Sequence, residues 1–324
     1  MLITRAPFRI SFFGGGTDYY DYFSKYGGCV LSTTIDKYCY VTMRHLPSFF
    51  EYQNQFTYSK IERFNSVNDI EHPLVRAALN HIPVEKIQIA YDADLPACSG
   101  IGSSSAFAVA LLQGLYALNG SFPDKMQLAR EAIYLEREYL KEAGGVQDQL
   151  AASFGGFNLM HFDKDGYRIE PVDIPAEIKS SLNENLMLAF TGFTHFSGKI
   201  AETQKKNIPA TISQLDEMKA LVYESASLLK KGELDSFGSL LDYTWRLKCS
   251  LSDRITNDTI DALYEKAKKH GALGGKLIGA GGGGFMLLYV PKEKQEQLRE
   301  NLPGLQYVPF SFESFGTDII YSDR

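Results

Sequence analysis

A chain of 324 residues, 44% hydrophobic and 22% charged, is long enough to bury the cores of two ordinary domains without disulfide bonds. Its formal net charge of −6, with no long run of lysine or arginine, argues against nucleic acid as a partner. The longest uninterrupted apolar stretch covers residues 106–112 and is far too short to span a bilayer, so no membrane partner is expected.

The four cysteines lie far apart, without a CxxC pair: Cys29, Cys39, Cys98 and Cys249. This spacing argues against a structural zinc site and is typical of a reducing compartment, where most cysteines are small buried side chains. The first residues also lack the apolar core of a signal peptide. We therefore expect a cytoplasmic protein, and the sequence carries no signal for an oligomeric state.

The first half of the chain combines β-branched and aromatic segments with two helical patterns. Strands are expected at residues 2–13, 28–35, 38–44 and 87–91. Helices are expected over 103–119 and 124–142, and Asp124 is the expected N-cap of the second. A stretch punctuated by glycines, residues 155–175, predicts a hairpin.

The second half has a different order of elements. It predicts a strand, two helical regions and a glycine-interrupted strand before a β-rich end, at residues 185–192, 200–250, 257–270 and 276–290. This order indicates α+β layers rather than continuous βαβ winding. We expect two domains, residues 1–178 and 179–324, with the boundary close to residues 174–185.

The strongest local signal lies in residues 94–120, where a small loop with glycines leads into an apolar helix. Gly100 and Gly102 permit positive φ and close approach to the backbone. Three serines, residues 103–105, follow at the helix N-terminus, where free N–H groups and the helix dipole favour an anion. The pattern predicts a triphosphate site with a hydroxyl left for Mg²⁺. By composition alone, a buried helix with a serine cap is an equally good interpretation.

Two other phosphate-binding patterns can be set aside. Neither Gly-Lys pair, at 198–199 and 275–276, is followed by serine or threonine, so there is no Walker A sequence. A GxGxxG pattern covers residues 279–284, but a strand pattern follows it where dinucleotide binding requires a helix.

Glu136 is an acidic residue in the middle of an apolar helix face. On a helical wheel it shares that face with Ala129, Ala132, Ile133, Tyr139 and Leu140. A buried carboxylate is costly unless it is paired, hydrogen-bonded or bound to a metal, so Glu136 is a candidate Mg²⁺ ligand. The alternative is a glutamate at the edge of the stripe that reaches solvent.

Asp148 follows a turn at Gly144–Gly145, in the sequence GVQDQ. An aspartate just after such a turn is most often a helix cap, and by itself this is the favoured interpretation.

Three segments, in this order, resemble the motifs of the GHMP kinase family: residues 5–21, 96–106 and 274–287. They lie between residues 5 and 287 and so span nearly the whole chain. The resemblance implies an α+β, two-domain GHMP kinase fold, with an N-terminal half like ribosomal protein S5 domain 2, a ferredoxin-like C-terminal half and the active site between them. It also implies transfer of the γ-phosphate of ATP, with Mg²⁺, to a hydroxyl of a small molecule.

Carried over residue by residue, the family motifs imply four sets of site residues. The implied ATP-binding residues are Pro96, Ser99, Gly100, Ile101, Gly102, Ser103, Ser104 and Ser105. The implied substrate-binding residues are Gly15, Gly16, Thr17, Asp18, Gly145 and Lys248. Ser104 and Glu136 would hold the metal. Asp148 would be the catalytic residue, as general base or as charge stabiliser, with Arg9 keeping it ionised.

Galactokinase has Gly-Glu-His before Thr-Asp, where this chain has three glycines, so galactose is not the expected substrate. The sequence is more similar to the subgroup with fucokinases and heptose 7-phosphate kinases, above all the latter, at residues 27–38, 145–158, 191–200 and 245–251. This implies phosphorylation at the anomeric hydroxyl of a sugar 7-phosphate, within nucleotide-activated heptose synthesis. A distal phosphate needs a cation, and the candidates are Lys37, His195, Lys199, Arg246 and Lys248.

Two alternatives stay open at this point. One is a fucokinase-like enzyme, or another sugar-1-kinase, that acts on an unphosphorylated sugar. The other is a non-catalytic sensor that binds sugar or ATP.

Overall fold

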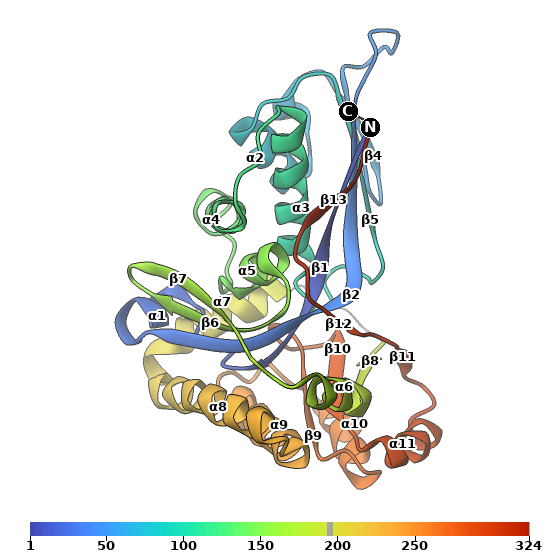
Figure 1. Ribbon diagram of the computed structural model, residues 1–324. Coiled ribbons are helices and arrows are strands. Elements are labelled where there is room, and N and C mark those ends of the chain that lie inside the picture. Colours follow the sequence, from blue (N-terminus) through green and yellow to red (C-terminus); the bar gives the residue numbers. More distant parts are fainter. Residues whose placement is uncertain (193–196, 324) are drawn as a thin grey trace.

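The computed structural model describes residues 1–192 and 197–323, which form two sheets with helices packed against them (Figure 1). The helices α3–α5 lie in the upper half of this view, α8–α10 lie in the lower half, and the long strands β1 and β2 run between them (Figure 1). Within the described residues, no helix combines the length and apolar character needed to cross a membrane.

The larger sheet contains nine of the described strands, and its main path has the order β13-β1-β2-β5-β3-β4. β6 and β12 pair with β2, and β7 pairs with β6. The strands are β1 (Leu2–Phe13), β2 (Gly28–His45), β3 (Asn54–Thr57), β4 (Ile61–Phe64), β5 (Ile87–Ala93), β6 (Phe157–Asp163), β7 (Gly166–Pro171), β12 (Phe312–Glu313) and β13 (Asp318–Ser322). The hairpin expected over residues 155–175 is confirmed as β6 and β7.

The two strands expected over 28–35 and 38–44 are in fact the single strand β2. The polar residues between them predicted a break, but the backbone stays extended there. β2 changes partner instead, because residues 28–33 pair with β6 and residues 39–45 pair with β5. The register of β1 against β2 also shifts close to this point, between Pro7 and Arg9.

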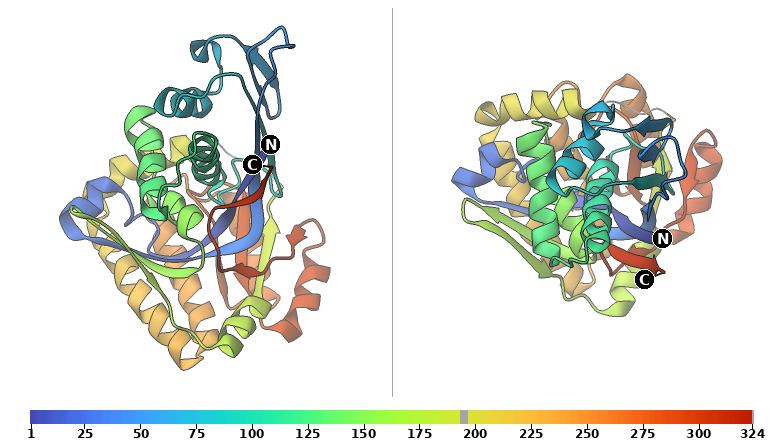
Figure 2. Two further views of the ribbon diagram at one scale, coloured as in Figure 1. Left: turned by 45° about the horizontal axis from the view of Figure 1, so that its top comes forward. Right: turned by 90° about the horizontal axis from the view of Figure 1, so that it is seen from above.

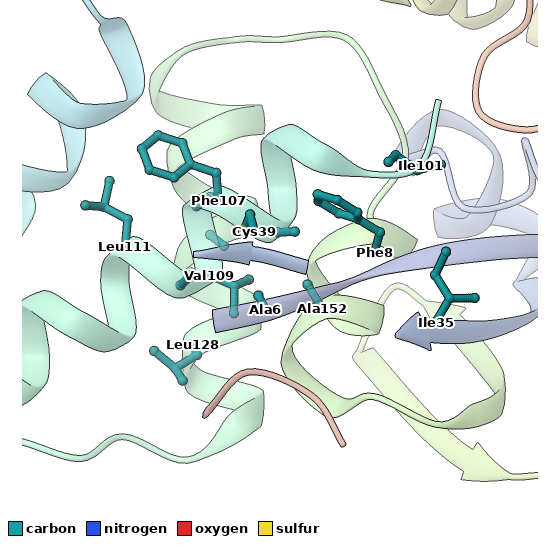
Figure 3. Packing of buried hydrophobic residues seen from close by; sticks show 14 of the residues in the cluster. Ala6, Phe8, Ile35, Cys39, Ile101, Phe107, Val109, Leu111, Leu128 and Ala152 are labelled. Atoms are coloured by element: carbon teal, nitrogen blue, oxygen red, sulfur yellow. The ribbon is translucent and has the colours of Figure 1, made fainter. Parts of the chain in front are cut away.

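Four helices lie on one side of this sheet: α2 (Pro73–His81), α3 (Ser103–Leu118), α4 (Lys125–Ile133) and α5 (Gln147–Phe154). α3 and α5 pack directly against β1 and β2, and α2 and α4 pack against α3. α3 is apolar nearly all round and therefore buried. Figure 3 shows its residues Phe107, Val109 and Leu111 in the core with Ala6 and Phe8 of β1.

The helix expected over 124–142 begins as predicted, because the Asp124 side chain accepts a hydrogen bond from the backbone N–H of Gln127. It does not continue as one α-helix. Residues Tyr134–Tyr139 form a π-helical segment, which contains Glu136. Such segments are rare and occur often at functional sites.

The smaller sheet is antiparallel and has the order β11-β8-β10-β9. Its strands are β8 (Leu186–Phe190), β9 (Gly274–Leu277), β10 (Phe285–Tyr289) and β11 (Gln306–Val308). The helices of this part and of the connections are α1 (Tyr20–Tyr26), α6 (Ala176–Asn185), α7 (Ser197–Asn207), α8 (Ile212–Lys231), α9 (Leu234–Cys249), α10 (Asp258–Lys269) and α11 (Gln295–Asn301). The segment expected to join the halves thus forms the helix α6.

The end of the chain returns to the larger sheet. β13 pairs with β1, β12 pairs with β2, and the two chain ends lie side by side (Figure 2). Residues 312–322 therefore belong structurally with the expected first half, although the sequence places them after residue 179. The division at 178/179 itself stays a prediction.

Candidate active site

A cavity of about 480 Å³ is lined by residues from both parts of the fold, the part around the larger sheet and the part around the smaller sheet. The lining comes from β1, the loop before α3, the start of α3, the π-helical segment, the turn before α5, the end of α9 and the loop after β9. Segments that are far apart in the sequence therefore meet around one space, and nearly all the residues expected to bind ligands lie on it or next to it.

The glycine-rich loop before α3 is held between β1 and the smaller sheet. The backbone N–H of Arg9 donates to the carbonyl of Ile101 (3.1 Å), and that of Phe285 donates to the carbonyl of Ser99 (3.1 Å). Gly100 has φ of +85°, and a Cβ there would overlap the carbonyl oxygen of Ile278. Only glycine fits here, because the loop packs backbone to backbone against the glycine-rich loop that follows β9.

Five of the eight expected ATP-binding residues line the cavity: Gly100, Gly102, Ser103, Ser104 and Ser105. The other three support the loop. Ser99 Oγ donates to the carbonyl of Pro96 (2.6 Å), and Ile101 is fully buried in the core. The first turn of α3 therefore faces the cavity with its free N–H groups, as an anion site requires.

Glu136 is buried, with 1% of its surface exposed, and lies against the start of α3. It accepts hydrogen bonds from Ser104 Oγ (3.0 Å), Ser105 Oγ (2.8 Å) and Gln149 Nε2 (2.5 Å). The alternative of a glutamate that reaches solvent is wrong. A carboxylate beside a serine hydroxyl is a set of oxygen donors that fits Mg²⁺.

Arg9 and Asp148, which both line the cavity, form a bidentate ion pair. Arg9 Nε lies 2.7 Å from Asp148 Oδ1 and Nη2 lies 2.9 Å from Oδ2, while Nη1 donates to the carbonyl of Gly100 (2.5 Å). Val146 occupies the N-cap position of α5, so Asp148 is not the helix cap. The pair links the glycine-rich loop to the other side of the cavity, and its geometry fixes the carboxylate.

Asp18 lies on that other side and is buried. It accepts hydrogen bonds from the backbone N–H groups of Gly16 (2.9 Å) and Gln147 (3.3 Å). Burial, and after it the nearby Asp148, raises the pKa of Asp18 above its ordinary value, against the lowering effect of these N–H groups. Gly15 and Gly16 line the cavity beside it, whereas Thr17 is buried and holds the turn by donating to the carbonyl of Gly14 (2.8 Å).

Gly145 lines the cavity where a Cβ would overlap the carboxylate of Asp18. Gly145→Ala is therefore expected to displace Asp18. This should lower kcat/KM for the acceptor, the small molecule whose hydroxyl is expected to receive the phosphate, by about 100-fold, the cost of misplacing a binding group by about 1 Å. Steady-state kinetics should show an unchanged KM for ATP. Gly304→Ala is the matched control, because nothing lies within 4 Å of a Cβ at that glycine. Equal kinetics in the two variants would contradict this role.

Two buried lysines line the same cavity. Lys248 Nζ donates to the carbonyls of Leu277 (3.0 Å) and Gly279 (2.5 Å), and Lys276 Nζ donates to the carbonyl of Phe12 (2.9 Å). Burial lowers the pKa of Lys248 to about 8 and that of Lys276 well below its ordinary value. Sequence reasoning missed Lys276, whose signal is a single charge inside an otherwise apolar strand.

The titration of Lys248 makes stability depend on pH. Its pKa is about 8 in the folded chain and near 10.5 when unfolded, so the unfolded state binds more protons between these values. The free energy of unfolding should therefore rise from pH 8 to 10.5, by at most about 3 kcal/mol from this group. Urea unfolding at several pH values should show that Lys248→Met loses this part of the rise and keeps the part that comes from Lys276, whose pKa is also lowered. The exposed Lys231→Met should keep the whole rise, and a pH-independent difference between wild type and Lys248→Met would contradict the assignment.

Of the cations expected to meet a distal phosphate, Lys248 lines the cavity. Lys37 pairs with Asp36 (3.1 Å) and Arg246 with Asp242 (3.1 Å), both away from it, and Lys199 is exposed outside the lining. His195 lies outside the described residues. Arg137, which the sequence did not single out, also lines the cavity and donates from Nε to the carbonyl of Gly145 (3.0 Å).

Comparison with known protein families gives two matches. The model described as the GHMP kinases N terminal domain matches residues 70–156, and the one described as GHMP kinases C terminal matches residues 225–307.

Among curated proteins, the chain is 31% identical to the D-glycero-alpha-D-manno-heptose 7-phosphate kinase of Campylobacter jejuni, over 97% of each chain. It is 27% identical to the bifunctional fucokinase/GDP-fucose pyrophosphorylase of Arabidopsis thaliana, over 91% of this chain and 30% of that one.

Solved structures show the same likeness. The crystal structure of a D-glycero-D-manno-heptose 1-phosphate kinase from Bacteroides thetaiotaomicron superposes with a TM-score of 0.82 at 26% identity, covering 99% of this chain and 100% of that one. The mevalonate kinase of Methanococcus jannaschii superposes with a TM-score of 0.74 at 17% identity, covering 96% and 98%. At that identity the second likeness shows the fold alone.

Fold, site and relatives together define the class: the protein is a small-molecule kinase, a phosphotransferase with an alcohol group as acceptor and ATP as phosphate donor. The chain belongs to the GHMP kinase family, and the expected two-domain α+β fold is confirmed.

Proposed function

We propose that the protein transfers the γ-phosphoryl group of ATP to the anomeric hydroxyl of D-glycero-D-manno-heptose 7-phosphate and so forms the 1,7-bisphosphate. The named relative from Campylobacter jejuni supports the substrate. The geometric support is the Arg9–Asp148 ion pair, which lies between the phosphate-binding turn of α3 and the acceptor side of the cavity with Asp18. A hydroxyl bound beside Asp18 meets both the carboxylate and the phosphate there.

The residues of the chain divide the work of the reaction. The first turn of α3 binds the phosphates, and Asp148 accepts the hydrogen bond of the sugar hydroxyl. The oxygen of the sugar hydroxyl forms the new bond to Pγ, while the bond from Pγ to the ADP oxygen breaks. The hydroxyl proton passes to Asp148 if the carboxylate acts as a base, and otherwise to an oxygen of the transferred phosphoryl group. Arg9 keeps the carboxylate ionised and in place. Catalysis of this kind is mainly positioning and charge stabilisation, and Asp148 serves it as a general base or as a charge stabiliser.

Magnesium is part of this proposal. Ser104 and Glu136 would hold the ion, which supplies positive charge for the phosphate oxygens when it is bound. The described residues contain no group of three or more His, Cys, Asp and Glu side chains that could hold a metal. This agrees with Mg²⁺, which is usually bound by one or two carboxylates together with substrate phosphates.

The cations of the acceptor side support an acceptor that carries a distal phosphate. Lys248, Arg137 and Lys276 line the cavity, and Arg137 contacts the acceptor side directly by donating from Nε to the carbonyl of Gly145 (3.0 Å). We place the activity in the cytoplasm, and the four cysteines, all free, support a reducing environment.

The test is ATP consumption by the purified protein with a panel of sugars and sugar phosphates, and NMR of each product. Formation of a 1,7-bisphosphate from the heptose 7-phosphate is the expected result. Turnover of fucose or another unphosphorylated sugar alone would show that the heptose 7-phosphate is not the substrate. It would favour the fucokinase-like alternative, to which the relative from Arabidopsis thaliana corresponds. Binding of sugar without any turnover would contradict the proposed function.

A further inference from the structure

Two oxygen atoms in the cavity wall have no hydrogen-bond partner within the described part of the chain. They are Ser11 Oγ and Gln147 Oε1, and both atoms are buried. The residues themselves are 4% and 9% exposed, and both line the cavity. A buried polar atom without a partner costs about 1–3 kcal/mol and is rare in folded proteins, so each of these needs a specific reason.

Ser11 lies next to the reaction centre. It follows Arg9 by two residues on β1, and since side chains of a strand alternate, the two share the face that lines the cavity. A Cβ at Gly15 would come within 3.8 Å of Ser11 Oγ. A side chain at position 15 would therefore lie against this hydroxyl, and the glycine leaves that position empty.

Gln147 lines the same cavity from the start of α5. It directly precedes Asp148, and its backbone N–H donates to Asp18 Oδ2 (3.3 Å). The residue thus lies between the two carboxylates of the acceptor side. Its amide oxygen can accept a hydrogen bond, and the Ser11 hydroxyl can both donate and accept one.

Lys276 explains how Ser11 is held. Its buried Nζ donates to the carbonyl of Phe12 (2.9 Å), the residue after Ser11. The register of β1 against β2 shifts between Ser11 and Phe13, so the strand is irregular at this point. A fixed contact from the smaller sheet keeps the irregular segment, and Ser11 with it, in one position.

We propose that Ser11 and Gln147 bind the non-reacting hydroxyl groups next to the one that is phosphorylated and thereby decide which acceptors the enzyme uses. A site that hydrogen-bonds a substrate hydroxyl rejects an analogue without it, because the buried polar groups then stay unpaired. This inference rests on the proposed function only in requiring a hydroxyl-rich acceptor. It does not depend on the heptose, and its test uses whichever acceptor of the panel binds most tightly.

The test begins with Ser11→Ala and Gln147→Met, which remove the polar atoms with little change in volume. Each should raise the KM for the acceptor, and its dissociation constant in calorimetry, by roughly two- to tenfold, the effect of one hydrogen bond. The KM for ATP and the melting temperature should stay as in the wild type. Ser225→Ala is the matched control, because that serine is equally buried but donates to the carbonyl of Val222 (2.8 Å) outside the cavity.

Acceptor analogues that lack one hydroxyl distinguish recognition from a structural role. The wild type should bind the complete acceptor more tightly than the analogue that lacks a neighbouring hydroxyl. The variant without the side chain that binds this hydroxyl should bind the two compounds about equally. Discrimination that is the same in wild type and variants would overturn the proposal, as would a KM for ATP that rises with that for the acceptor. Failure of the heptose proposal would show differently, as binding or turnover of another sugar in the panel.

Discussion

Asp148→Asn is expected to lower kcat by about 10²–10⁴-fold, the usual contribution of a positioned proton acceptor. The variant keeps the shape of the side chain but loses its charge. Its NH₂ group cannot accept the hydrogen bond of the acceptor hydroxyl. In the wild type Arg9 donates to both carboxylate oxygens, and in the variant its buried positive charge faces a neutral amide with only one accepting oxygen. The binding of ATP should change little, because the phosphate-binding turn of α3 is unaltered.

Single-turnover kinetics and calorimetry with ATP separate these two effects. Asp173→Asn is the matched control, since that aspartate is exposed and lies outside the cavity lining. Normal turnover in Asp148→Asn would remove Asp148 from the catalytic step. Loss of ATP binding along with turnover would show that the ion pair acts mainly by shaping the loop at Gly100.

Local sequence patterns predicted most elements of this fold. The strand over residues 2–13, the helix over 103–119, the hairpin over 155–175 and the cap Asp124 are confirmed because short-range preferences decide them. The burial of Glu136 was one of the two outcomes that the pattern allowed, since a single carboxylate in an apolar helical stripe is either buried with partners or reaches solvent.

Contacts between distant segments were beyond the reach of such patterns. Arg9 and Asp148 are 139 residues apart, and only the folded chain shows that they form a bidentate pair. β12 and β13 join the larger sheet through pairing with β1 and β2, and nothing in their own sequence selects that partner. For the same reason the oxygens of Ser11 and Gln147 could not be recognised as unpartnered.

The π-helical segment shows a different limit. The sequence of residues 124–142 fits one continuous α-helix, and local preference gives no reason to widen a turn at 134–139. The tertiary structure does give one. Three donors converge on Glu136, and the widened turn is where its carboxylate meets them.

Glu136→Gln is expected to raise the Mg²⁺ concentration that gives half-maximal activity. Loss of an outer partner of a metal site already weakens affinity by roughly 10–100-fold, and loss of a direct carboxylate ligand should cost at least as much. An amide cannot supply the negative charge, and its NH₂ group would face donors where the carboxylate accepts from Ser104, Ser105 and Gln149. A titration of activity with Mg²⁺ at saturating ATP measures the effect.

Glu138→Gln serves as control, because Glu138 is exposed on the same π-helical segment. Its Mg²⁺ titration should match that of the wild type. If the titration of Glu136→Gln matches as well, while its melting temperature falls, Glu136 is a structural acceptor that holds the start of α3 and not a metal ligand. A shifted Mg²⁺ titration with a nearly unchanged melting temperature would instead show that Glu136 is buried because it binds the metal. A glutamate that only holds the start of α3 in place would leave the Mg²⁺ requirement unchanged.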